Sequence, residues 1–179
     1  SIVAGATMDS IRHTLRTPAV VRVMPNTPAQ IGLGISVWTA TPAATEEQKG
    51  QALAILQALG EEVFVDDEVY LDMATALSGT GPAYVFLLME AMVDAGVHLG
   101  FSRHVSERLV IETMRGTVEY ARQSARHLAT LRNQVTSPGG TTERAIRVFE
   151  EEGLEQLVKR AMTAARDRSI ELSSQLPED

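Results

Sequence analysis

The pattern of apolar residues changes near Asp66, and this change constrains the fold of the 179-residue chain more than any other feature. Before it, short runs rich in β-branched residues, Val20–Met24 and Leu33–Ala40, alternate with helical pattern, which is typical of α/β folds. After it, no strand pattern remains, and helix follows helix. We therefore predict an α/β domain over residues 1–66 and an all-helical domain over residues 67–179.

End signals delimit the elements of the first domain. Pro25–Pro28 predicts a loop, because each proline restricts the residue before it to extended geometry. Thr45–Gln48 is a capping box. The helix that it opens ends at Gly60 and carries three leucines on one side: Leu53, Leu56 and Leu59. Glu62–Val65 predicts one more strand, so we expect a remnant of a parallel sheet.

The second domain consists of predicted helices only. Their expected ranges are 68–78, 82–99, 103–124, 128–133, 141–152 and 154–174. The stretch Ala83–Val97 is apolar on nearly its whole circumference, which requires burial on all sides. Either it is the core helix of a monomer or, as we expect, part of its surface meets a second copy of the chain across a two-fold axis. Charges at Glu90 and Asp94 argue against a membrane span.

Composition excludes several function classes. The net charge is −7, with no basic stripe, which argues against nucleic-acid binding. Cysteine is absent, which excludes disulfides, thiolate catalysis and cysteine-based zinc sites, and fits a reducing cytoplasm. The start, Ser1–Thr7, lacks the features of a signal peptide.

Titratable side chains form no metal or hydrolytic pattern. The four histidines, which lack metal-ligand spacing, are His13, His98, His104 and His127. We expect them to be structural or surface groups, and we predict no metal site. Asp66–Glu68 and Glu150–Glu152 are interpreted as solvated charge runs, the first at a helix start where the dipole favours acids.

Two glycine-rich segments are candidate ligand contacts. Gly32-Leu-Gly34 is rejected as a phosphate loop, since it leads into a strand rather than a helix. Ser78–Tyr84 lies between two predicted helices, with Pro82 suited to a first helical position. It is either a plain helix-helix corner or part of a site.

Thr136–Thr142 is the sharper candidate. Two consecutive glycines, flanking hydroxyls and a helix that starts immediately afterwards favour an anion site for a carboxylate or a phosphate. The alternative is a loop in which Thr141 or Thr142 is only an N-cap.

Asn26 follows a predicted strand, at the end where α/β sheets bind ligands. Its alternative role is to serve the turn alone.

Taken together and in order, these motifs resemble the pyrroline-5-carboxylate reductase family. The segments that carry the resemblance are Val3–Ala6, Met24–Pro28, Leu59–Val65, Leu77–Tyr84, Asp94–Gly96 and Val135–Thr142. The resemblance implies a Rossmann-type dinucleotide-binding domain followed by an all-α dimerisation domain, a bundle like that of 6-phosphogluconate dehydrogenase. It also implies a cytoplasmic homo-oligomer built from dimers. The implied reaction transfers hydride from NADPH or NADH to 1-pyrroline-5-carboxylate, giving L-proline in the last step of proline biosynthesis.

The resemblance also implies roles for individual residues. Thr142 is the catalytic candidate, beside the ring nitrogen, where it would orient or relay the proton. The implied substrate-binding residues are Ser137, Gly139, Gly140, Thr141, Thr142, Ser78, Gly79 and Thr80. The implied cofactor-binding residues are Ala4, Gly5, Met24, Pro25 and Asn26.

The departure from the family pattern is at the start of the chain. The family's first strand, its Gly-x-Gly-x-x-Gly turn and the following helix have no counterpart in these residues. We therefore expect the 179 residues alone to bind dinucleotide poorly and to turn over little substrate.

Two other functions compete with this interpretation. One is that of another imine reductase or a β-hydroxyacid dehydrogenase, but those enzymes generally place a lysine on the long helix, and Ala83–Leu99 has none. The other rival is a non-catalytic dimerisation module.

Overall fold

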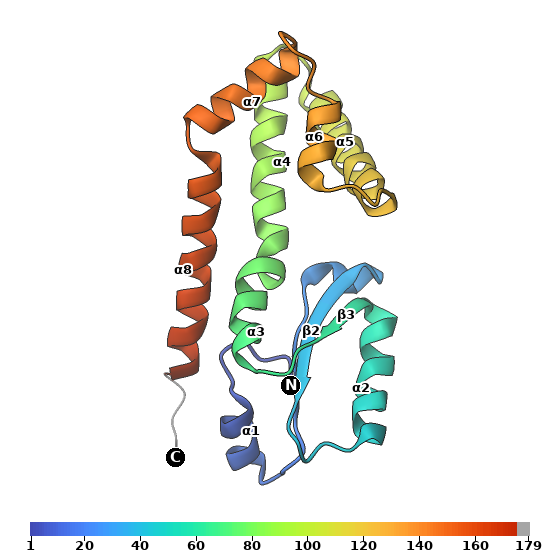
Figure 1. Cartoon of the computed structure of the whole chain (residues 1–179), viewed down its shortest axis with the longest axis vertical. Coiled ribbons are helices and arrows are strands. Elements are labelled where there is room, and N and C mark those ends of the chain that lie inside the picture. Colours follow the sequence, from blue (N-terminus) through green and yellow to red (C-terminus); the bar gives the residue numbers. More distant parts are fainter. Residues whose placement is uncertain (175–179) are drawn as a thin grey trace. The chain divides into compact units, whose positions relative to one another are not determined.

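The computed structural model describes residues 1–174 and divides into two compact units (Figure 1). Of the described residues, the first unit contains 1–84 and 159–174, and the second contains Val85–Val158. These limits differ from the boundary that we expect near Asp66. That boundary divides the chain by function and not by compactness, and it stays a prediction. The elements are α1 (Met8–Leu15), β1 (Val21–Met24), a 3₁₀ helix (Thr27–Ile31), β2 (Gly34–Ala40), α2 (Glu46–Leu59), β3 (Gly60–Phe64), α3 (Val69–Ala74), a π-helical segment (Thr75–Gly79), α4 (Gly81–His98), α5 (Arg103–Gln123), α6 (Leu128–Gln134), α7 (Thr141–Glu151) and α8 (Leu154–Ser174).

The sheet of the first unit has the order β1-β2-β3. β2 and β3 are parallel, because α2 forms the crossover between them. β1 and β2 are antiparallel, with Met24 opposite Val37. The prediction of a parallel sheet is therefore wrong for β1 and β2. The connection from β1 to β2 contains only a short 3₁₀ helix, which reverses the chain but is too short for a parallel crossover.

Each face of the sheet packs against a different helix. Because side chains alternate along a strand, Val23 and Trp38 point to one face, where they pack against Leu56 of α2. Met24 points to the other face and packs against Leu71 of α3. The predicted strands and the predicted capping box at the start of α2 are confirmed. Helices therefore cover both faces of a small sheet, as in α/β folds.

The helices after Asp66 are confirmed to within about two residues of their predicted ends, with one correction. The expected corner at Ser78–Tyr84 is wrong, because helical structure runs on through a π segment from Val69 to His98. The helix α1, which begins after its N-cap Thr7, was not predicted. Its apolar residues Met8, Ile11 and Leu15 do have helical spacing, but the segment is only eight residues long.

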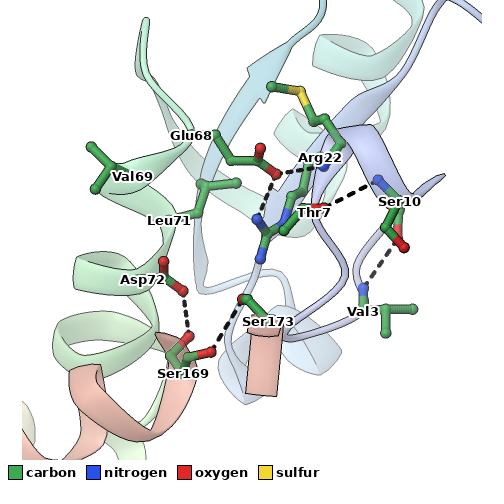
Figure 2. A network of polar contacts seen from close by, with 12 residues as sticks. Val3, Thr7, Ser10, Arg22, Glu68, Val69, Leu71, Asp72, Ser169 and Ser173 are labelled. Carbon is green, nitrogen blue, oxygen red and sulfur yellow. Dashed lines mark hydrogen bonds and ion pairs between the residues drawn. The ribbon is translucent and has the colours of Figure 1, made fainter. Parts of the chain in front are cut away.

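A polar network joins four elements of the first unit and corrects one prediction (Figure 2). Asp66 and Asp67 are exposed, as expected, but Glu68 is partly buried. Its Oε1 accepts from Nη1 of the buried Arg22 at 2.5 Å and from the amide of Met8 at 2.7 Å. Nearby, the buried Ser169 of α8 donates to Asp72 of α3 at 2.6 Å. The acidic run is thus partly structural, and not wholly solvated.

The apolar helix α4 is little buried. Its buried residue is Val93, and its exposed large apolar residues are Val85, Phe86, Leu87, Leu88, Met92 and Val97. By length and composition, the stretch Val69–His98 could cross a membrane. That is weak evidence, since core helices of soluble proteins pass the same test. In the second unit, Gly96 of α4 lets Ser106 of α5 approach closely, because a Cβ there would lie 2.7 Å from its Oγ.

Candidate functional site

The loop after β1 is held by the side chain of Asn26. Its Oδ1 accepts from the amide of Ile35 at 3.0 Å, and its Nδ2 donates to the carbonyl of Ser78 at 3.3 Å. Next to it, a Cβ on Gly79 would lie 3.1 Å from Sδ of Met24. The structure therefore brings together four predicted site residues from two distant parts of the chain. Asn26 does more than serve its own turn.

Side-chain hydroxyls from the same helical run donate to carbonyls in and around the π segment. A π turn is wider than an α turn and disturbs the regular pairing of carbonyls with amides. Hydroxyls satisfy several of these carbonyls: Thr75 donates to Leu71, Ser78 to Ala74, Thr80 to Thr75, and Tyr84 to Ala76, at 2.7–3.1 Å. Ser78, Gly79 and Thr80 are half-buried here. Such π segments are frequent at functional sites.

Ala4 and Gly5 form a separate tight turn before α1. The amide of Ala6 donates to the carbonyl of Val3 at 3.4 Å. Gly5 has φ +81°, which favours glycine. A Cβ on Gly5 would also lie 3.0 Å from Cβ of Leu172. The glycine is thus required for close packing against α8, while Ala4 is exposed.

The turn Ser137–Thr142 belongs to the second unit. The amide of Gly140 donates to the carbonyl of Ser137 at 2.9 Å, and Gly139 has φ +71°. Gly140 is the N-cap of α7, and no side chain caps this helix. The alternative in which Thr141 or Thr142 is the N-cap is therefore wrong. First-turn amides have no partner within a helix, so the start of α7 presents donors to an anion.

Glu143, which was not among the predicted site residues, contacts the glycine turn. Its Oε2 accepts from the amide of Gly139 at 2.5 Å, and its Oε1 lies 3.7 Å from Nη2 of Arg147. A hollow of about 220 Å³ is lined by Gly139, Gly140, Glu143, Arg144 and Arg147. A glutamate three residues after an N-cap is the signal of a capping box and could have indicated this contact. Here the acceptor reaches one residue further back.

The histidines are surface groups, as expected. All four are exposed, and Nδ1 of His127 accepts from the amide of Ala129 at the start of α6. Among residues 1–174, no three His, Asp or Glu side chains gather to hold a metal ion.

Comparison with known proteins gives the family. Residues 68–172 match the family model for the pyrroline-5-carboxylate reductase dimerisation domain. The chain is 47% identical to pyrroline-5-carboxylate reductase of Pseudomonas aeruginosa over 98% of its own length and 65% of that enzyme. It is 38% identical to the Synechocystis enzyme over 96% of its own length and 64% of that enzyme. The chain thus spans slightly less than two thirds of these curated relatives.

Solved structures agree over nearly the whole chain. The Plasmodium falciparum pyrroline carboxylate reductase with NADP bound superimposes with a TM-score of 0.90 at 32% identity, covering 97% of this chain and 70% of that one. The Coxiella burnetii pyrroline-5-carboxylate reductase gives a TM-score of 0.91 at 39% identity, covering 97% of this chain and 64% of that one. The matched dimerisation model covers more than half of the chain and includes both the π segment and the glycine turn before α7, and the chain therefore belongs to the pyrroline-5-carboxylate reductase family.

Proposed function

We propose that the chain is part of an enzyme that reduces 1-pyrroline-5-carboxylate to L-proline. The observation that carries the proposal is the turn Ser137–Thr142, whose helix starts without a side-chain cap in a chain whose relatives are named for this reaction. A five-membered cyclic imine with a carboxylate suits an anion site with a hydroxyl beside it. The same geometry would bind the product, which carries the same carboxylate.

The chain's own residues have three tasks in this reaction. Amides at the start of α7 and the hydroxyl of Ser137 bind the substrate carboxylate and fix the face of the ring that is presented. Thr142 lies half-buried in the first turn of α7, and its hydroxyl orients or relays the proton that the ring nitrogen gains. The backbone of Ser78–Thr80 lines the substrate. No strong base is needed, because the imine nitrogen is readily protonated in water.

The cofactor-binding group is Ala4, Gly5, Met24, Pro25 and Asn26. The donor set fits the polar nicotinamide end, because the carboxamide of Asn26 uses one N–H and one lone pair within the chain and keeps one of each for a ligand. When bound, NADPH or NADH supplies the hydride to the C=N carbon and is itself oxidised by two electrons. The carbon gains hydride and the nitrogen gains a proton, which balances the conversion of imine to amine.

The enzyme is proposed to be a homo-oligomer built from dimers through the helical part. Support comes from the exposed apolar residues of α4, two of which, Phe86 and Leu87, are 64% and 67% exposed. We further infer that residues 1–66 belong to a Rossmann domain and that residues 67–179 form a bundle like that of 6-phosphogluconate dehydrogenase. The absence of cysteine is consistent with a cytoplasmic enzyme.

The reaction is tested by following NADPH oxidation with 1-pyrroline-5-carboxylate. The polypeptide assayed carries these 179 residues together with a dinucleotide-binding segment, and its intact mass is determined first. Thr142→Val is expected to lower kcat about 100-fold, and Ser137→Ala to raise KM about tenfold. Thr113→Val, at an exposed threonine of α5, is the matched control. Turnover that is unchanged in Thr142→Val would refute the assigned role.

The dimer is tested separately by light scattering after size-exclusion chromatography. Phe86→Asp and Leu87→Asp each place a charge on the apolar surface of α4 and should give monomers. Leu15→Asp, a matched change at an exposed leucine of α1, should leave the dimer intact. A monomeric wild-type protein would contradict the proposed assembly.

A further inference from the structure

We propose that Asn26 is a positioning residue, whose carboxamide locks the π segment Thr75–Gly79 to the loop that follows β1. This contact between two parts of the chain does not depend on what the protein binds. Its functional consequence rests on the proposed function, in which Ser78–Thr80 line the substrate and Met24–Asn26 line the nicotinamide. Asn26 would then set the distance between the substrate-lining residues and the nicotinamide-lining residues.

The first observation is the register of the sheet. β1 and β2 pair up to Met24 opposite Val37, and the same register continued by two residues places Asn26 opposite Ile35. The backbone carbonyl of Asn26 is already used, since it accepts from the amide of Ala29 at the start of the 3₁₀ helix. Oδ1 of Asn26 accepts from the amide of Ile35 instead. The side chain therefore extends the sheet by one hydrogen bond after the strand has ended.

The second observation is the other end of the same carboxamide. The hydroxyls that donate to carbonyls in and around the π segment come from the same helical run, within eight residues of their acceptors. The donor to the carbonyl of Ser78 is Nδ2 of Asn26, which lies 52 residues away in sequence. One planar group thus joins β2 to the π segment.

The third observation is the packing beside this bridge. Gly79 lies against Met24, and a Cβ there would approach Sδ to 3.1 Å. Met24 is buried, with its side chain in the cluster that contains Leu71. The π segment therefore has a polar contact with the loop, through Asn26, and an apolar contact with the last residue of β1, Met24. The hydrogen bond from Asn26 fixes the orientation of the Ser78 carbonyl, because a hydrogen bond is directional and an apolar contact is not.

The test separates the two ends of the carboxamide. Asn26→Ala removes both hydrogen bonds. Asn26→Asp keeps an acceptor for the amide of Ile35, but at neutral pH it has no donor for the carbonyl of Ser78. At a pH low enough to protonate the introduced carboxyl group, a donor returns. Gln30→Ala, at an exposed amide in the adjacent 3₁₀ helix, is the matched control.

The measurement is made by NMR on the 179-residue chain. It records hydrogen-exchange protection of the Ile35 and Thr80 amides and the carbonyl carbon shift of Ser78, with the amide of Leu56 in α2 as reference. In Asn26→Ala, protection should fall about tenfold at both amides, while protection at Leu56 is unchanged. In Asn26→Asp, protection should be retained at Ile35 and lost at Thr80, and lowering the pH should restore the carbonyl shift.

Two results would overturn the proposal. One is unchanged Thr80 protection and an unchanged Ser78 carbonyl shift in Asn26→Ala. The other is an equal loss of protection at Leu56, which would indicate general destabilisation. Titration with L-proline then tests the consequence: weaker binding in Asn26→Asp than in Gln30→Ala is expected. If the wild-type chain shows no shifts with L-proline at the start of α7, the proposed function fails, while the exchange data still decide the role of Asn26.

Discussion

The buried ion pair between Arg22 and Glu68 gives the sharpest stability prediction for this protein. The Arg22 side chain is 4% exposed and that of Glu68 is 25% exposed, and they meet at 2.5 Å (Figure 2). Oε1 of Glu68 also accepts from the amide of Met8, which begins α1. Removing the carboxylate therefore leaves a buried guanidinium and a helix amide without this acceptor.

The expected magnitude follows from that geometry. Breaking a buried pair by removing one partner costs about 3–5 kcal/mol. Because the Glu68 side chain is still 25% exposed to solvent, we expect the lower end of this range, about 3 kcal/mol, for Glu68→Ala. Glu68→Gln keeps an uncharged acceptor and should cost about 2 kcal/mol. Arg22→Met should cost less than Glu68→Ala, since the remaining carboxylate can turn toward water.

Urea unfolding followed by the fluorescence of Trp38, the single tryptophan, measures the loss in the unit that contains the pair. A loss of about 3 kcal/mol should move the unfolding midpoint down by about 1–3 M urea. Arg12→Ala breaks the exposed pair with Asp9 and should leave the midpoint nearly unchanged. If Glu68→Ala moves the midpoint no further than Arg12→Ala, or if the cycle with Arg22→Met shows no coupling, the reasoning is refuted.

Three further predictions concern other contacts. Gly60→Ala should lower the free energy of unfolding by at least about 3 kcal/mol in the same urea assay, because Gly60 has φ +138° and its Cβ would clash with the carbonyl oxygen of Gly34. A small loss would contradict the close approach of these two strands. Ser169→Ala should cost about 1–2 kcal/mol, through the lost charge-assisted bond to Asp72, and Asp72→Ala should remove most of this difference in a double-mutant cycle. The pKa of Glu119 is lowered, first by the hydrogen bond from Gln123 and then by Arg122, so the contribution of Glu119 to stability is present above its unfolded pKa and is lost as the pH falls through its folded value. Gln123→Ala should raise that pKa in an NMR titration, and an unmoved titration would contradict the assigned cause.

Local signals predicted most elements of this fold. The capping box at Thr45–Gln48, the stop at Gly60 and the β-branched run Val20–Met24 each depend on residues within a few positions of one another. Such signals act through backbone geometry and nearby hydrogen bonds, so they can be read without tertiary structure. The order of the motifs also indicated the family.

Two helical elements and one cap differ from the sequence-based expectation. α1 has apolar residues at helical spacing, but it is only eight residues long, and it is held by its cap Thr7 and by the distant Glu68. Gly79 and Pro82 suggested a corner, but the helical run continues through a π segment in which hydroxyls donate to carbonyls. At the glycine turn before α7, two threonines were equally plausible caps, and the backbone resolved this by placing Gly140 at the N-cap instead.

Only the tertiary structure decided which distant residues act together. Arg22 meets Glu68 across 46 residues, and Asn26 meets Ser78 across 52. The direction of β1 against β2 was likewise decided by the length and path of the connection between them. The sequence by itself determined where most helices and strands form, because backbone preferences and caps are local. Which side chains become buried partners depends on how the elements pack, and in a chain this long many pairings satisfy the same local pattern.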